Sequence, residues 1–324
     1  MRWLAQASIA GPLLGLLVVA GARADDTYPT KPIHIVVGFA AGGGNDILAR
    51  LVGQKLSEDL GQPVVVDNKP GASSIIAAEF VAHAAPDGST LLMGPSGAMT
   101  VNPAVYAKLP YAPLRDFIPV SQIALFPLML VVSPKLPIAS ISDLVAYAKA
   151  NPAKANYASS STAFQLTTEL FKQKTGAPLE MVNYKSGNEM ILSVVSGEAL
   201  MTIVDTAPVG PQILSGNVRA LATTAGQRMA DYPQVPTMTE AGLPDMTVSL
   251  WTGLFAPAHT PAAIVTKLQD EVIRIVRLPD IGQRMRALAV EPTGTTSAAF
   301  GHVVSTDITR WTEVAKASHI KLDP

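Results

Sequence analysis

The 324-residue chain contains no cysteine. Disulfide bonds, thiolate catalysis, cysteine-bound zinc and a lipid anchor on cysteine are therefore excluded. Charged residues are only 15% of the sequence and aromatic residues only 6%, whereas hydrophobic residues reach 48%. This balance is typical of a chain that buries a large core, and it argues against a disordered protein. The length is comfortable for two domains.

Basic clusters and metal-binding patterns are missing as well. The formal net charge is -1, which leaves no basic surface for nucleic acid. The histidines are scattered, and none is spaced from another as metal ligands are. The three glycines at 42–44 lack both the G-x-G-x-x-G pattern and a P-loop lysine, and no G-x-S-x-G serine motif occurs. We therefore expect no catalytic residue, no metal site and no bound cofactor.

The first 24 residues have the pattern of an export signal. Arg2 is followed by the apolar run Ile9–Val19, and Ala22-Arg23-Ala24 fits an A-x-A cleavage site. The run is short for a membrane span, and no other stretch approaches the ~20 apolar residues that a membrane helix needs. We predict cleavage before Asp25 and a mature protein in the periplasm. A retained anchor is the alternative.

The stretch Ile33–Arg50 predicts a strand, a glycine-rich turn and a helix in succession. Four of the five residues at 33–37 are β-branched, and apolar residues recur at helical spacing from Ile47 onward. Such a turn directs backbone N–H groups and the positive end of a helix dipole at whatever lies above it, which suits an anion. The alternative is a tight turn in which Asn45 only caps the helix.

The same plan returns in the middle of the chain. A short strand at 156–158 leads through a small polar loop into a helix at 164–174, and a later strand ends at Asp205. Strands that alternate with helices indicate doubly wound sheets, which bind ligands at the carboxyl ends of their strands. We therefore predict an α/β protein with two doubly wound lobes, two hinge crossings near 125–128 and 248–255, and a cleft between the lobes.

Short motifs follow one another in a fixed order along the mature chain. They include Tyr28-Pro29, Gly61-Gln62-Pro63, Ala85-Pro86-Asp87-Gly88, Asn156-Tyr157-Ala158-Ser159 and Gly253-Leu254-Phe255-Ala256-Pro257. In order and spacing the chain resembles the Bug/TctC family, the periplasmic solute-binding proteins of tripartite tricarboxylate transporters. The resemblance implies a receptor like other periplasmic binding proteins, which closes on a small carboxylated molecule and delivers it to a membrane permease. The expected division is a signal peptide at 1–24, a first lobe from 25–126 and 252–324, and a second lobe from 127–251.

The resemblance also implies which residues hold the ligand. In relatives the first loop binds a ligand carboxylate largely through backbone groups. The positions of this chain that match the site are Phe39, Ala41, Gly42, Gly43, Asn45, Asp46, Ser96, Gly97, Ser159, Ser160, Ser161, Thr162, Tyr184 and Asp205. The loop that leads to Phe164 departs from the family pattern, because it is shorter and no histidine follows it. As alternatives, Asp46 only favours the helix dipole, Asp205 only ends a strand, and Tyr184 lies in a solvated turn.

The sequence thus predicts a receptor that captures its ligand with backbone donors and helix N-termini and then closes about a hinge. The expected partners are the small carboxylate and the permease subunits, and a monomer is expected. Two alternatives stay open. The closed receptor acts as a sensor that docks on a membrane kinase, or the scaffold carries an enzyme with Asp46 or Asp205 as its base.

Overall fold

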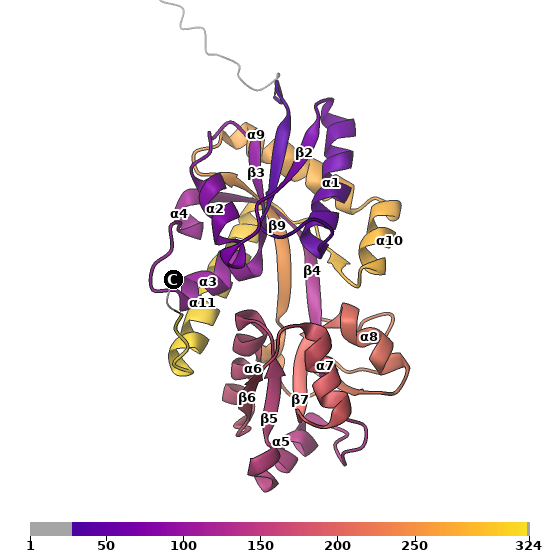
Figure 1. Cartoon of the computed structure of the whole chain (residues 1–324). Helices are drawn as coiled ribbons and strands as arrows, with labels where there is room; N and C mark the ends of the chain where they lie inside the picture. Colours follow the sequence, from indigo (N-terminus) through magenta and orange to yellow (C-terminus); the bar gives the residue numbers. More distant parts are fainter. Residues whose placement is uncertain (1–27, 323–324) are drawn as a thin grey trace, which may run out of the picture.

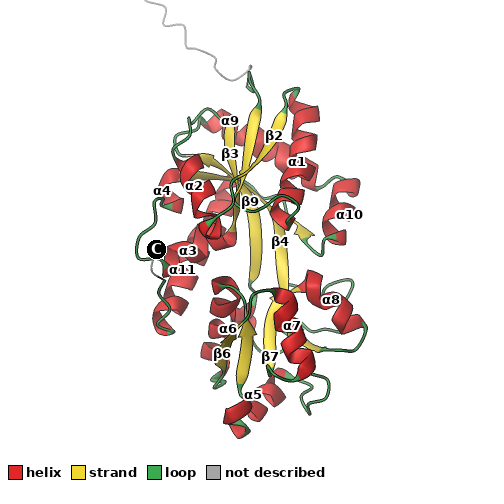
Figure 2. Ribbon diagram, viewed as in Figure 1, coloured by secondary structure: helices red, strands yellow, loops and turns green. Residues whose placement is uncertain are grey.

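The structure, a computed structural model, describes residues 28–322, so the predicted signal peptide lies outside the described residues. They form two α/β lobes, one above the other in Figure 1, and helices cover both faces of each sheet (Figure 2). One continuous path of strands runs through both lobes in the order β2-β1-β3-β9-β4-β7-β5-β6. The two-lobed α/β fold predicted from the sequence is confirmed. No helix within residues 28–322 is both long and apolar enough to cross a membrane.

The first lobe is built on three parallel strands that alternate with helices. These elements are β1 (Ile33–Val37), α1 (Gly44–Leu60), β2 (Val64–Asn68), α2 (Ile75–Ala82) and β3 (Thr90–Pro95). Helix α1 ends where Gly61 adopts a left-handed conformation and its N–H bonds the carbonyl of Ser57. The order β2-β1-β3 brings the ends of β1 and β3 side by side at one sheet edge.

The second lobe repeats this plan. Its elements are α5 (Ile141–Ala150), β5 (Asn156–Ser159), α6 (Thr162–Thr175), β6 (Glu180–Asn183), α7 (Gly187–Ser196), β7 (Met201–Asp205), α8 (Thr206–Leu214) and β8 (Arg219–Thr223). Strand β5 pairs in parallel with β6 on one side and with β7 on the other, as β1 does with β2 and β3. The ends of β5 and β7 therefore lie together, as those of β1 and β3 do.

Two long strands join the lobes. The first ten or so residues of β4 (Phe117–Val132) pair with β9 (Ser249–Pro257), and its last part pairs with β7 and β8. The sequence predicted a strand only from Leu128, because proline disfavours strand interiors. The structure tolerates Pro119 because it lies at a shift of the β4–β9 register, where the ladder is already interrupted.

The C-terminal segment returns to the first lobe and then crosses the hinge. It comprises α9 (Ala262–Val276), α10 (Pro279–Ala287), β10 (Glu291–Pro292) and α11 (Ser297–Ala317). Phe300 and Val304 of α11 join a first-lobe cluster, whereas Trp311 and Val314 join the core of the second lobe. Helix α11 is thus a third connection between the lobes. The shorter helices are η1 (Ala72–Ser74), η2 (Gly97–Val101), α3 (Asn102–Val105), α4 (Pro113–Asp116), η3 (Pro152–Lys154) and η4 (Pro244–Met246).

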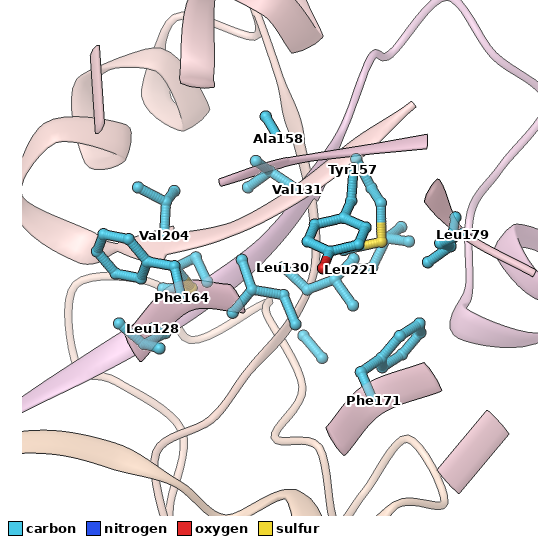
Figure 3. Close-up of a cluster of buried hydrophobic side chains, with 14 of the residues drawn as sticks. Leu128, Leu130, Val131, Tyr157, Ala158, Phe164, Phe171, Leu179, Val204 and Leu221 are labelled. Atoms are coloured by element: carbon cyan, nitrogen blue, oxygen red, sulfur yellow. The ribbon is translucent and has the colours of Figure 1, made fainter. Parts of the chain in front are cut away.

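Each lobe has its own apolar core. In the first lobe, residues of β1 such as Ile33 and Ile35 pack with Leu48 and Leu56 of α1. Figure 3 shows the second core, where Tyr157 and Phe171 gather around the β4 and β7 side chains, including Leu130. Burial of these apolar surfaces is the main favourable term that stabilises both sheets. The two lobes thus pack around separate cores, and α11 contributes side chains to both.

Gly253, in the middle of β9, has no room for a side chain. A Cβ at this position would overlap the ring of Phe300 and lie 2.9 Å from the carbonyl oxygen of Ser121. We expect Gly253→Ala to lower the free energy of unfolding by about 2 kcal/mol, measured by urea denaturation. Gly301→Ala is the matched control, because its Cβ would meet only Pro119 at 3.9 Å. Equal stabilities of the two variants would contradict this close packing.

Candidate functional site

A cavity of about 670 Å³ lies between the lobes. Its volume is within the range of roughly 300–1,000 Å³ that is usual for small-molecule sites. The first lobe contributes residues at the ends of β1 and β3, and the second lobe contributes residues at the ends of β5 and β7. Phe126, Pro127 and Trp251 of the two crossing strands lie along its hinge side. The cavity therefore occupies the edge at which both sheets present the carboxyl ends of their parallel strands.

Four helix N-termini face this cavity. The lining includes Gly44 and Asn45 at the start of α1 and Thr162 and Ala163 at the start of α6. It also includes the residues that begin the continuous helix 97–105 and helix α8. Since the first N–H groups of a helix have no partner within the helix, each N-terminus offers donors and a partial positive charge. The arrangement can bind an anion although no lysine, arginine or histidine is among the described residues that line it.

Asp46 supports the glycine-rich loop from behind. Its carboxylate accepts hydrogen bonds from Gly42 N (2.9 Å), Asn68 Nδ2 (2.9 Å) and Arg50 Nε (3.0 Å). The side chain is only 3% exposed, and the bond from Arg50 is the main cause that lowers its pKa to about 2. Gly42 has a φ of 85°, which favours glycine. Asp46 therefore fixes the loop that ends at α1 and does not itself line the cavity.

Asp205 lies in the cavity wall of the second lobe, at the junction of β7 and α8. It occupies the N-cap position of α8, yet its side chain makes no capping hydrogen bond. Burial raises the pKa of this carboxyl to about 6. Asp205 is also the one ionisable side chain among the described lining residues, so it sets the charge of the cavity.

Two further polar groups of the first lobe lack partners among the described residues: one belongs to Asn45 in the cavity wall, and the other to Ser74, which follows the lining residue Ser73 in sequence. The Oδ1 atom of Asn45 and the hydroxyl of Ser74 are buried and have no hydrogen-bond partner within residues 28–322. Ser74 belongs to a left-handed turn in which Ala72, Ser73 and Ser74 all have positive φ, and Ser73 lines the cavity. Such local strain is found most often at functional sites.

Trp251 is held rigidly at the hinge side of the cavity. Its backbone N–H donates to Ser96 Oγ (3.2 Å), and its indole N–H donates to Asp307 Oδ2 of α11 (2.8 Å). The indole also stands edge-on to the ring of Phe300, with 5.0 Å between ring centroids. At the mouth, in contrast, Phe39 and Ile47 are 40% and 38% exposed. Closure of the lobes would cover these two side chains.

Half of the residues predicted to bind the ligand line the cavity: Phe39, Asn45, Ser96, Gly97, Ser161, Thr162 and Asp205. The other half do not, and these are Ala41, Gly42, Gly43, Asp46, Ser159, Ser160 and Tyr184. Ser159 ends β5, and its hydroxyl donates to the carbonyl of Ser161 (3.1 Å). Tyr184 instead faces a second, shallower pocket beside Glu189 and Glu198. Contact of any of these residues with a ligand stays a prediction.

Several lining residues were missed by the sequence reasoning. Phe126, Pro127 and Leu250 belong to segments that were predicted as hinge crossings and not as cavity wall. Residues 288–290 carry no local signal, because they reach the cavity only through the pairing of β10 with β4. In the loop between β5 and α6, Phe164 turns into the core and is 8% exposed, so the loop contributes 161–163 alone.

Comparisons with known proteins agree with this geometry. Residues 48–320 match the family described as the tripartite tricarboxylate transporter family receptor, TctC. Protein BugT of Bordetella pertussis is 33% identical over 318 residues, which cover 97% of this chain and 98% of that protein. The structure of R. palustris Rpa4515 with adipate has a TM-score of 0.76 and 35% identity, with 92% of this chain and 100% of that chain covered. MatC (Rpa3494) from Rhodopseudomonas palustris with bound malate has a TM-score of 0.72 and 31% identity, with 89% and 99% covered.

Proposed function

The chain belongs to the tripartite tricarboxylate transporter receptor family, and from this we propose that it captures a small organic carboxylate between its lobes for delivery to the membrane subunits of such a transporter. The observation that carries the proposal is the convergence of four helix N-termini on a cavity with no basic side chain among its described lining residues. Helix N-termini bind carboxylates through N–H groups and the dipole. The family's receptors are periplasmic, and we propose that this chain reaches the same compartment after cleavage before Asp25.

Capture and closure follow from where the donors lie. The N-termini of α1 and α6 belong to different lobes, so a carboxylate that both bind would draw the lobes together. We propose that 25–126 with 252–324 and 127–251 move as the two units, while β4, β9 and α11, which contributes to the cores of both lobes, flex between them. Closure then buries the exposed Phe39 and Ile47 at the mouth. The closed form is the one that the permease would recognise.

We propose binding and release without chemical change. Acid–base catalysis needs a positioned proton donor or acceptor, and most often a second group that cooperates with it. The described lining residues offer Asp205 as the single ionisable side chain. Asp46, the other candidate base, is only 3% exposed and already bonded to Gly42, Arg50 and Asn68. Recovery of a chemically altered ligand from the purified receptor would overturn this part of the proposal.

The binding function predicts that carboxylates raise the melting temperature. A ligand present at about ten times its Kd should stabilise the receptor by about 1.4 kcal/mol through mass action. A thermal-shift panel of mono- and dicarboxylates measures this. In Ala163→Trp a large ring fills the cavity at the start of α6 and should abolish the shift. Ala146→Trp, at an exposed site on α5 of the same lobe, should leave it intact. The proposal fails if no carboxylate shifts the wild type, or if Ala163→Trp retains the shift.

A further inference from the structure

Each lobe has one aspartate close to a helix N-terminus that faces the cavity, Asp46 at α1 and Asp205 at α8, and the two carboxylates differ in what surrounds them. Asp46 accepts hydrogen bonds from three protein groups, including Arg50. Asp205 accepts no capping bond from α8, and burial is the one cause that shifts its pKa. Asp46 is therefore satisfied by the protein, whereas Asp205 presents an unpaired carboxyl to the cavity.

The sequence of α8 explains why Asp205 is unpaired. An N-cap aspartate ordinarily accepts a hydrogen bond from the N–H of the second or third helical residue. In α8 the third helical residue is Pro208, which has no N–H, and the carboxylate makes no bond to the remaining candidate, Ala207. Both residues line the cavity together with Asp205. The carboxyl is thus left without a capping bond at a place where it borders the cavity.

The surroundings of Asp205 provide no counter-charge. Among the elements packed against β7, strands β4 and β5 and helix α8 carry no charged side chain. Helix α6 carries Glu169, Lys172 and Lys174 and helix α7 carries Glu189, and none of these shifts the pKa of Asp205. The lining residues Phe126, Pro127 and Leu250 cannot donate through their side chains, and the hydroxyl of Thr206 donates to the carbonyl of Pro127 instead. The carboxyl of Asp205 is therefore open to a donor on the bound molecule.

Resting on the proposed function, we infer that the ligand is a monocarboxylate that also carries a hydrogen-bond donor, an amine, amide or hydroxyl group, that faces Asp205. A second carboxylate in the place of that donor would meet a like charge in a cavity with no basic side chain among its described lining residues. The apolar walls, Phe39, Ile47, Phe126 and Trp251 among them, fit an apolar body between the two polar ends. The receptor would then differ in specificity from the relatives whose structures hold adipate and malate.

A set of six-carbon acids that differ only at the far end tests this inference. The probes are 6-aminohexanoate, adipate monoamide, hexanoate and adipate, and affinities are measured by calorimetry at about pH 8, where Asp205 is ionised. A rigid series, 4-(aminomethyl)benzoate, 4-methylbenzoate and terephthalate, repeats the comparison at a different length. We expect the amine and the amide to bind at least about tenfold more tightly than the dicarboxylate of the same series, because hydrogen bonds to a charged group are strong.

The variant Asp205→Asn is the decisive one. It removes a buried charge and retains the shape, so it should fold, and the preference for amine over dicarboxylate should fall by about tenfold or more. Asp143→Asn, at an exposed site in the first turn of α5, is the control and should leave the preference unchanged. Lowering the pH to about 5 should also reduce the ratio of the affinity for the amine to that for the dicarboxylate in the wild type, since Asp205 becomes neutral. Any pH-dependent decrease of this ratio that persists in Asp205→Asn comes from titration of the ligand.

The outcomes separate this inference from the proposed function. If adipate binds the wild type as tightly as 6-aminohexanoate, or if Asp205→Asn leaves their ratio unchanged, the inference is wrong and the carboxylate receptor stands. If no member of either series binds the wild type, the inference is wrong, and the thermal-shift panel alone decides whether the carboxylate receptor stands. A tenfold or larger preference that Asp205→Asn removes and Asp143→Asn retains establishes the donor end of the ligand.

Discussion

Asp46→Asn should lower the free energy of unfolding by about 2 to 3 kcal/mol at neutral pH. The pKa of Asp46 is lowered to about 2, mainly by the bond from Arg50, and the side chain is only 3% exposed. An asparagine there lacks the charge of the carboxylate. It also has only one acceptor oxygen, so its NH2 group would face one of the two donors, either the N–H of Gly42 or the amide NH2 of Asn68. The glycine-rich loop should loosen, so ligand affinity should fall together with stability.

The pH dependence of this effect follows from the direction of the shift. Because the pKa of Asp46 is lower in the folded state than in the unfolded chain, its contribution is complete above about pH 4 and is lost as the pH falls through about 2. The stability difference between wild type and Asp46→Asn, measured by urea denaturation, should therefore shrink between these values. Asp67→Asn is the control, since its exposed pair with His34 should contribute less than about 1 kcal/mol. A difference that does not depend on pH would contradict the role of the ionised carboxylate.

Trp251→Ala should be more destabilising, by about 4 kcal/mol. The indole is 2% exposed and packs on Phe300, so its removal leaves a cavity at the junction of β9 and α11. It also leaves the carboxylate of Asp307, which is 8% exposed, without the donor at 2.8 Å. Ligand affinity should fall as well, because Trp251 forms part of the cavity wall.

The contribution of the indole N–H can be separated from that of ring packing. Trp251→Phe keeps an aromatic ring and loses the bond to Asp307, whereas Trp311→Phe changes an equally buried indole that bonds no described residue. Denaturation curves should show the larger loss for Trp251→Phe, by about 1 to 2 kcal/mol. Equal losses for the two variants would mean that the Asp307 contact contributes nothing beyond packing.

The repeated plan of the lobes could be predicted because it depends on local pattern. Branched residues, glycine turns and helical spacing around Ile33–Arg50 define β1 and α1, and the same signals recur around β5 and α6. The full length of β4 was not predicted, because proline disfavours strand interiors and the register shift at Pro119 becomes apparent only in the pairing with β9. The crossing of α11 onto the second lobe was missed for the same reason, since tertiary packing of Trp311 and Val314 decides it.

The lining residues that come from the loops after parallel strands could be predicted from the sequence. Those that come from the crossing strands and from residues 288–290 could not. Asn45, Ser96 and Ser161 each follow a parallel strand, and a sheet places such residues at one edge. The aspartates could not be told apart from sequence, because the difference lies in their partners. Asp46 accepts hydrogen bonds from Arg50, one helical turn away, and from Asn68 of β2. Asp205 has no such donor at the third residue of its helix, because Pro208 has no N–H.

The place of β9 in the first sheet bears on how the protein is made. This strand, residues 249–257, lies between β3 and β4, which belong to the N-terminal half of the chain. Until β9 has left the ribosome, β3 and β4 have no strand to join them, so the first sheet cannot be completed during most of synthesis. Domains whose strands are contiguous in sequence can fold as they emerge. The first lobe cannot complete its sheet in this way, because β9 emerges only after the whole of the second lobe has been made.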